Sequence, residues 1–180
     1  DLPCTCRRQR QMCIRDSYTN GINEEMTLDN CTHSLFGTSK VYADLLVQEY
    51  NKNFGVKTAC FRAGCITGPN HSGAKLHGFL SFLVKECVRN KTYQIIVYKG
   101  KQVRDNIHSF DVAKFIFEYI QNPKIAAVYN IGGGYQNSIS IIESIKKIEN
   151  LTGIKMNYEY SDNSRVGDHI CYYSDLGRLS

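Results

Sequence analysis

Phe36 and Lys40 lie four residues apart, a spacing that could serve proton chemistry. On a helix, residues i and i+4 share one face, so the lysine ammonium would lie one turn from the aromatic ring. If the aromatic residue were a tyrosine, its phenol could act as an acid or a base near neutral pH, because the ammonium would lower the pKa of the phenol. Phenylalanine has no hydroxyl and neither donates nor accepts a proton. Since any helix offers such pairs, the spacing alone does not assign a function.

Two arginines, each close to an aspartate, could bind phosphate groups. Arg104 directly precedes Asp105, and Arg165 lies three residues before Asp168. The planar guanidinium group makes paired hydrogen bonds to phosphate oxygens, which suits a diphosphate better than a lysine ammonium does. The alternatives are a surface ion pair for Arg104 and Asp105 and a solvated loop charge for Arg165. Considered without further context, these alternatives are the simpler interpretation.

The glycine and cysteine patterns indicate no further site. Gly132-Gly133-Gly134 lacks the Gly-x-Gly-x-x-Gly spacing of a dinucleotide-binding loop, and no Lys-Ser/Thr follows it, so we interpret it as a flexible connection between a strand and a helix. Of the 8 cysteines, three lie within residues 1–17. The other five are scattered, without a Cys-x-x-Cys pair or a histidine at ligand spacing. We therefore expect free thiols and no metal site.

Charge and hydropathy disfavour nucleic acids and membranes as partners. The net charge is +5, from 22 basic and 17 acidic residues, and beyond residue 17 the basic residues are scattered. No apolar run approaches the roughly 20 residues that span a bilayer. No charged-then-apolar leader is present, so we expect a cytoplasmic protein. Residues 1–17 have no periodicity and resemble translated adapter read-through; we expect them to be non-native and disordered, the alternative being a basic interaction arm.

Helices and strands alternate along the rest of the chain, which predicts an α/β fold. Apolar residues three and four positions apart predict helices over 39–54, 76–88 and 109–120, and a capping box at Ser140 and Glu143 predicts a helix that continues to residue 151. We expect Ser109 to cap the third helix, and Gly55 and Gly153 to end the first and the last. Strands are predicted over 56–61, 93–98, 102–107, 125–131 and 154–160.

Four motifs in order resemble the extended short-chain dehydrogenase/reductases, the NAD-dependent epimerase/dehydratase family. They are the Gly-x-Ser-Lys helix at 37–40 with its following strand, Arg62 and Gly68-Pro69; Arg104-Asp-Asn-Ile-His108; Tyr129-Asn-Ile-Gly-Gly133; and Arg165-Val-Gly-Asp168. Within the family, the chain is most similar to the group of CDP-paratose 2-epimerases. That likeness rests on the segments 33–40, 68–73, 77–80 and 98–105.

The resemblance implies roles at the matching positions. Lys40 would hold the ribose hydroxyls of NAD, and Ala63 and Gly64 would press against the nicotinamide. Phe36 occupies the position of the family's catalytic tyrosine, so the acid or base would be displaced, to Ser34, His33 or another part of the protein.

On the substrate side, Arg104 and Arg165 would bind the diphosphate, and Asp168 would contact the nucleotide ribose or orient Arg165. His71, His77 and His108 could border the sugar, and we assign none of them as a base.

The resemblance also implies the architecture and the reaction. We expect residues 18–64 to be the tail of a Rossmann-type NAD-binding domain and residues 65–180 to be a smaller α/β substrate-binding domain, incomplete at its C-terminus, with some chain passing back between them. The preceding half, with the glycine fingerprint, would be missing. The complete enzyme would be a homo-oligomer that epimerises a nucleotide-activated sugar through a keto intermediate. The alternatives are a 4-epimerase, a 4,6-dehydratase, or a non-catalytic binding relative, given Phe36.

Overall fold

The computed structural model describes residues 21–26, 34–74, 78–96, 98–124, 127–161 and 170–179, and the predicted α/β class is confirmed there. The α-helices of these ranges are α2 (Leu35–Phe54), α3 (Phe79–Val88), α4 (Ser109–Gln121) and α5 (Ile141–Thr152). The strands are β1 (Ala59–Ala63), β2 (Cys65–Thr67), β3 (Tyr93–Ile96), β4 (Val103–His108), β5 (Ala127–Ile131), β6 (Ser138–Ser140), β7 (Tyr158–Ser161) and β8 (Cys171–Tyr172).

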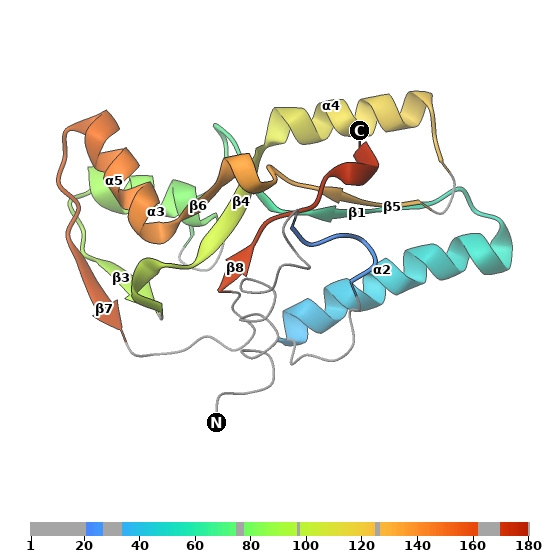
Figure 1. Cartoon of the computed structure of the whole chain (residues 1–180), viewed down its shortest axis with the longest axis horizontal. Helices are drawn as coiled ribbons and strands as arrows, with labels where there is room; N and C mark the ends of the chain where they lie inside the picture. Colours follow the sequence, from blue (N-terminus) through green and yellow to red (C-terminus); the bar gives the residue numbers. More distant parts are fainter. Residues whose placement is uncertain are drawn as a thin grey trace.

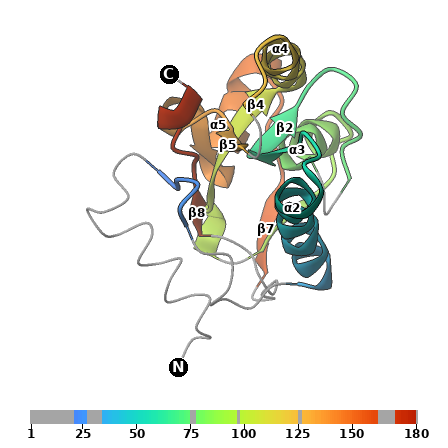
Figure 2. The ribbon, with the colours of Figure 1, turned by 90° about the vertical axis from the view of Figure 1, so that its right-hand side faces the viewer.

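One part of the molecule is a parallel pair of strands between two helices. β1 pairs with β5, and α4 and α2 lie on opposite sides of this pair (Figures 1 and 2). Phe61 of β1 and Tyr129 of β5 contact Phe115 and Tyr119 of α4, with ring centroids 5.1–6.1 Å apart. Edge-to-face aromatic contacts of this kind add stability beyond the area that they bury. The chain after residue 64 therefore returns, through α4, to pair with β1.

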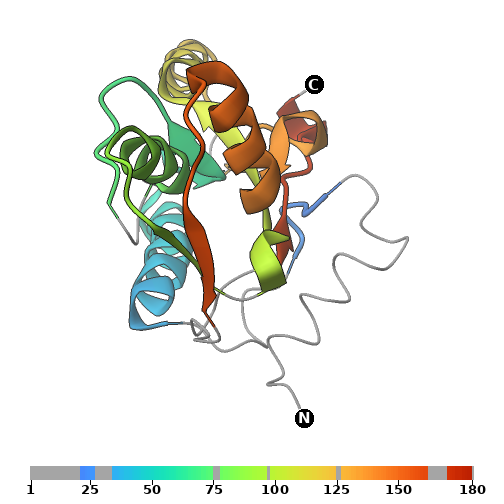
Figure 3. The ribbon, with the colours of Figure 1, turned by 90° about the vertical axis from the view of Figure 1, so that its left-hand side faces the viewer.

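A second part holds the remaining strands with α3 and α5. β4 lies at the centre of a sheet, with parallel β2 and β8 and antiparallel β6 as partners, and β3 pairs in parallel with β7. A hydrophobic core joins α3, α5 and β3, and Figure 3 views this end of the molecule. The core residues are Leu83, Cys87, Ile95, Ile145, Ile148 and Met156.

The helix ends follow local capping chemistry, with two corrections. The Ser140 and Glu143 capping box is confirmed, and Gly55 and Gly153 end their helices with φ of 65° and 72°. Helix α2 begins at Leu35, four residues before the predicted start, because the Ser34 hydroxyl accepts a hydrogen bond from the Gly37 amide at 3.1 Å.

The prediction that Ser109 caps α4 is wrong. Ser109 is the first helical residue, and the preceding His108 caps the helix by accepting a hydrogen bond from the Phe110 amide at Nδ1 (3.1 Å). The strand predicted over 154–160 begins only at Tyr158, and the Met156 amide donates to Glu149 Oε1 of α5 at 2.9 Å instead of to a neighbouring strand.

A largely buried ion pair joins α2 to β1. Arg62 Nε donates to Asp44 Oδ2 at 2.7 Å and its terminal nitrogen donates to Oδ1 at 3.2 Å, while the two side chains are only 19% and 10% exposed. Burial raises the pKa of Asp44, but the hydrogen bonds from Arg62 and its neighbours outweigh this effect and lower the pKa below its ordinary value. Burial beside Asp44 raises the pKa of the Cys60 thiol to about 12. The Asp44 carboxylate is therefore charged in the folded protein at neutral pH.

None of the helices in the parts of the chain described above is long and apolar enough to cross a membrane.

Candidate functional site

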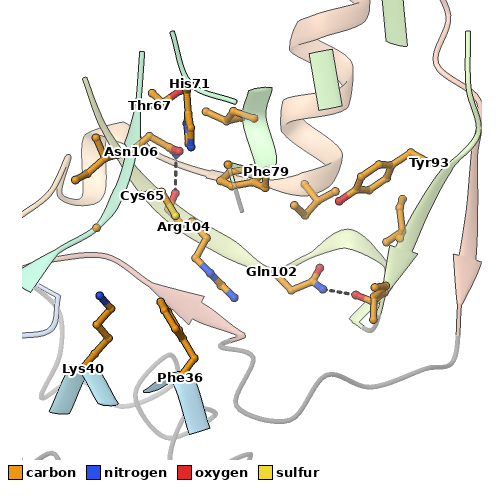
Figure 4. Close-up of a pocket in the computed structure, with 17 residues that line it drawn as sticks. Phe36, Lys40, Cys65, Thr67, His71, Phe79, Tyr93, Gln102, Arg104 and Asn106 are labelled. Carbon is orange, nitrogen blue, oxygen red and sulfur yellow. Dashed lines mark hydrogen bonds between the residues drawn. The ribbon is translucent and has the colours of Figure 1, made fainter. Parts of the chain in front are cut away.

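A cavity of about 650 Å³ lies along one side of β4, between the first turns of α2 and the unit formed by α3 and β3 (Figure 4). This volume is within the range of roughly 300–1,000 Å³ that small-molecule sites occupy. Its walls come from segments far apart in the sequence: α2, β2, β3, β4 and the start of α3. The cavity is therefore a property of the tertiary fold.

Four of the predicted site residues line this one cavity. Phe36 and Lys40 point into it from α2, Gly64 lies beyond the end of β1, and Arg104 projects from β4 (Figure 4). Ala63 is exposed at the end of β1 and is not among the lining residues. Arg165 and Asp168 lie outside the described residues.

Phe36 and Lys40 contact each other across one helical turn. Lys40 Nζ lies 5.2 Å from the centre of the Phe36 ring, within the range of a cation–π contact. The shared helix face is thus confirmed, and the group beside the ammonium is a phenyl ring that carries no proton for transfer. Ser34, one candidate for a displaced acid or base, uses its hydroxyl to cap α2. His33, the other, lies outside the described residues.

The charges around the cavity favour an anionic ligand. Lys40 and Arg104 both line it, and no aspartate or glutamate is among its described lining residues. A concave surface that carries charge of one sign attracts ligands of the opposite sign. Phosphate oxygens suit such a surface, since a guanidinium and an ammonium both form charge-assisted hydrogen bonds with them.

Asp105 does not form the surface ion pair that was the alternative for Arg104. Adjacent residues of a strand point to opposite faces, and the Asp105 side chain is fully buried on the other side of β4. Its Oδ2 accepts hydrogen bonds from the amides of Ser174 at 3.0 Å and Gly134 at 3.3 Å. A Cβ on Gly64 would overlap the Asp105 carboxylate, so packing alone requires a glycine at that position.

Sequence reasoning missed two amide side chains on either side of Arg104. Gln102 and Asn106 also line the cavity, and each has a buried carbonyl oxygen without a hydrogen-bond partner. Their amide nitrogens are engaged: Gln102 donates to the carbonyl of Ile96, and Asn106 donates to that of Arg104 at 3.1 Å (dashed lines in Figure 4). Since buried polar atoms are normally paired, both oxygens suit donors on a ligand. Both residues lie two positions from Arg104, and residues two apart in a strand share one face. This spacing could have predicted from the sequence that they belong to the same site.

One of the predicted histidines lines the cavity, and another caps a helix. His71 lines the cavity, with a buried Nδ1 that has no hydrogen-bond partner. His108 caps α4, and His77 lies outside the described residues. Within the described ranges, no three His, Cys, Asp or Glu side chains converge as metal ligands would. The Gly132–Gly134 segment connects β5 to a short 3-10 helix (Tyr135–Asn137) and does not line the cavity.

The comparisons with known proteins agree on one family. Residues 16–132 match the NAD dependent epimerase/dehydratase family. CDP-paratose 2-epimerase from Salmonella typhi is 33% identical over 168 residues, which are 89% of this chain and 48% of that protein. dTDP-D-glucose 4,6-dehydratase from Dictyostelium discoideum is 30% identical over 143 residues, 76% of this chain and 31% of that protein.

A solved structure has the same fold. The dTDP-glucose 4,6-dehydratase DesIV from Streptomyces venezuelae, with NAD and TYD bound, superposes with a TM-score of 0.75 at 21% identity, over 89% of this chain and 48% of that one. The chain spans about half the length, or less, of the relatives that it matches. Because the family match covers more than half of the 180 residues, the chain belongs to the NAD dependent epimerase/dehydratase family.

Proposed function

We propose that the natural protein carrying this chain is an NAD-dependent epimerase of a nucleotide-activated sugar, with an activity like that of CDP-paratose 2-epimerase. The observation that carries the proposal is the single cavity lined by Lys40 and Arg104 and by no described acidic residue. The 33% identity to the Salmonella enzyme supports the choice of a CDP-sugar.

The residues present fit the two ligands. Lys40 would hold the ribose hydroxyls of NAD, and Gly64, which lines the cavity next to Ala63, would lie against the nicotinamide. Arg104 would bind the substrate's diphosphate, with Arg165 and Asp168 completing that side. NAD, when bound, would accept a hydride from a sugar carbon and return it. This chain's own contribution is to position the sugar between Lys40 and Arg104 and to exclude water.

Phe36 favours a second candidate, a binding relative without turnover. The phenyl ring stands where the family has its tyrosine, and Ser34 is engaged as a helix cap. Tyr42 does not line the cavity, so it does not replace the missing phenol. If the protein turns over, its acid or base lies elsewhere, and general acid–base catalysis of about 10²–10⁴-fold would depend on that group.

Turnover of the natural protein, Phe36→Tyr and Lys40→Met on CDP-, UDP- and dTDP-sugars tests the proposal. We expect the natural form to epimerise a CDP-sugar and Lys40→Met to abolish the reaction. An inert natural form that gains turnover through Phe36→Tyr would establish the binding relative instead. Inversion at carbon 4, or loss of water from the sugar, would identify a 4-epimerase or a 4,6-dehydratase, activities that its relatives represent.

We propose further that the protein acts in the cytoplasm as a homo-oligomer. Exposed apolar side chains along α2, including Tyr50 and Phe54, support a contact surface on this helix. Sedimentation of the natural protein tests this, and a monomer at all concentrations would contradict it.

A further inference from the structure

His71 brings to the cavity an imidazole ring whose nitrogens make no hydrogen bond to another described residue. Its Nδ1 is buried, and buried polar atoms are normally paired, so the ring suits a partner on a ligand. A neutral imidazole has one donor nitrogen and one acceptor nitrogen. The ring can therefore take up a proton from a ligand that fills the cavity and can also release one to it.

Backbone contacts hold this ring in place. The His71 amide donates to the carbonyl of Gly68 at 3.1 Å, which closes a turn directly after β2. A Cβ on Gly78 would come within 2.6 Å of the His71 ring, so the ring packs against a glycine that also lines the cavity. Gly78 has a φ of 71°, a conformation that favours glycine. The position of the imidazole is therefore determined by the local backbone on both sides.

His71 faces the cavity from the wall opposite helix α2. Figure 4 shows its ring pointing toward the side from which Phe36 and Lys40 project. The stretch of chain that carries it begins at Gly64 and runs along the cavity through β2. If Arg104 binds the diphosphate and the nicotinamide lies against Gly64, the sugar lies between them. His71 and Phe36 then border the sugar from opposite sides.

His71 is also the lining residue best suited to proton transfer. Histidine serves most often as a general acid or base, and His71 is the one histidine among the described lining residues. The Arg104 guanidinium does not lose its proton in proteins, Lys40 is assigned to the cofactor ribose, and the Cys65 thiol already interacts with another group. Tyr93 lies on the side of the cavity away from α2 (Figure 4).

We propose that His71 is the acid–base residue that replaces the phenol missing at Phe36, an inference that rests on the proposed function. An imidazole nitrogen accepts the hydroxyl proton of the reacting sugar carbon while the hydride of that carbon leaves for the nicotinamide of NAD. The carbon becomes a carbonyl, and the ring becomes an imidazolium. When the hydride returns to the other face of the carbon, the imidazolium gives its proton back to the oxygen, and the ring regains its starting state.

Turnover of His71→Gln tests the inference, because glutamine keeps a polar side chain but cannot carry the proton. We expect kcat to fall by about 10²–10⁴-fold while KM changes little. Adding Phe36→Tyr to His71→Gln should restore turnover, since a phenol then lies beside Lys40. His108→Gln makes the same change in a histidine that caps α4 and does not line the cavity, and it should leave kcat unchanged. A double variant as slow as His71→Gln would overturn the inference.

A binding measurement on the natural protein decides the matter even if His71→Gln does not fold. A CDP-sugar that lacks the hydroxyl on carbon 2, the carbon that the proposed activity inverts, should bind roughly tenfold more weakly than the complete CDP-sugar. Equal affinities would overturn the inference.

The outcomes separate this inference from the proposed function. If the natural protein and His71→Gln turn over equally fast, the inference about His71 alone is overturned. If the natural protein binds the CDP-sugar without turnover, the proposed epimerase activity fails, and the inference fails with it.

Discussion

Restoring a hydroxyl beside Lys40 gives a direct measurement of the electrostatics of the site. In Phe36→Tyr, the new phenol would lie on the helix face that carries the Lys40 ammonium, 5.2 Å from the ring centre in the present structure. A positive charge at that distance favours the phenolate and lowers the pKa of the phenol. The size of the change depends on how well water screens the pair.

The magnitude follows from this distance. With the ring centre taken as the position of the phenolate charge, two unit charges 5.2 Å apart interact by about 0.8 kcal/mol in bulk water and by about 3.2 kcal/mol at an effective dielectric of about 20. Since one pKa unit is about 1.36 kcal/mol, the pKa would fall by about 0.6 to 2.3. Phe36 is 58% exposed, which places the value toward the lower limit. We therefore expect the new phenol to titrate near pH ~9, about one unit below an ordinary tyrosine.

Ultraviolet absorbance of the phenolate measures this pKa. The chain contains 12 tyrosines, so the titration of the natural protein is subtracted from that of Phe36→Tyr. The matched control is the same substitution in a Lys40→Met background, where the side chain is one atom shorter and has no charge. The midpoint should return to about 10. Equal midpoints with and without the ammonium would refute the assigned geometry.

Three further predictions concern stability, each measured by thermal unfolding of the natural protein. The pKa of Asp44 lies below its ordinary value of 3.8, so its pairing with Arg62 stabilises the fold above that pH and is lost as the pH falls through the lower, folded-state value. Asp44→Asn should therefore lower the free energy of unfolding by about 3 kcal/mol at neutral pH and by much less in acid. A loss of stability that is independent of pH would contradict this. Gly64→Ala should destabilise by ~1–3 kcal/mol, because the added methyl group overlaps the buried Asp105 carboxylate, and an unchanged melting temperature would show that the carboxylate moves freely. Ser140→Ala should cost about 1 kcal/mol through loss of the helix cap, while Ser140→Asp, which keeps an acceptor, should cost less; equal losses would argue against capping.

The helix ends and the elements themselves could be predicted because they depend on neighbours in the chain. The capping box at Ser140 and the left-handed glycines at 55 and 153 need only residues within one turn. The cap of α4 was misassigned by one residue, since a histidine ring can accept the same hydrogen bond as a serine hydroxyl. The strand predicted over 154–160 began later than expected, where the Met156 amide bonds Glu149 Oε1 of α5 and not a neighbouring strand.

The cavity required contacts that the order of residues does not contain. The four motifs indicated that Lys40 and Arg104 belong to one site, yet 64 positions separate them, and only the tertiary fold, in which α2 packs against β1, brings both to one cavity. The buried Asp105 carboxylate, held by an amide 69 residues away, explains the glycine at 64. The unpaired oxygen of Gln102 likewise follows from its bond to Ile96 on another strand. Local spacing determines which side chains share a face, whereas burial and pairing depend on which distant segment covers that face.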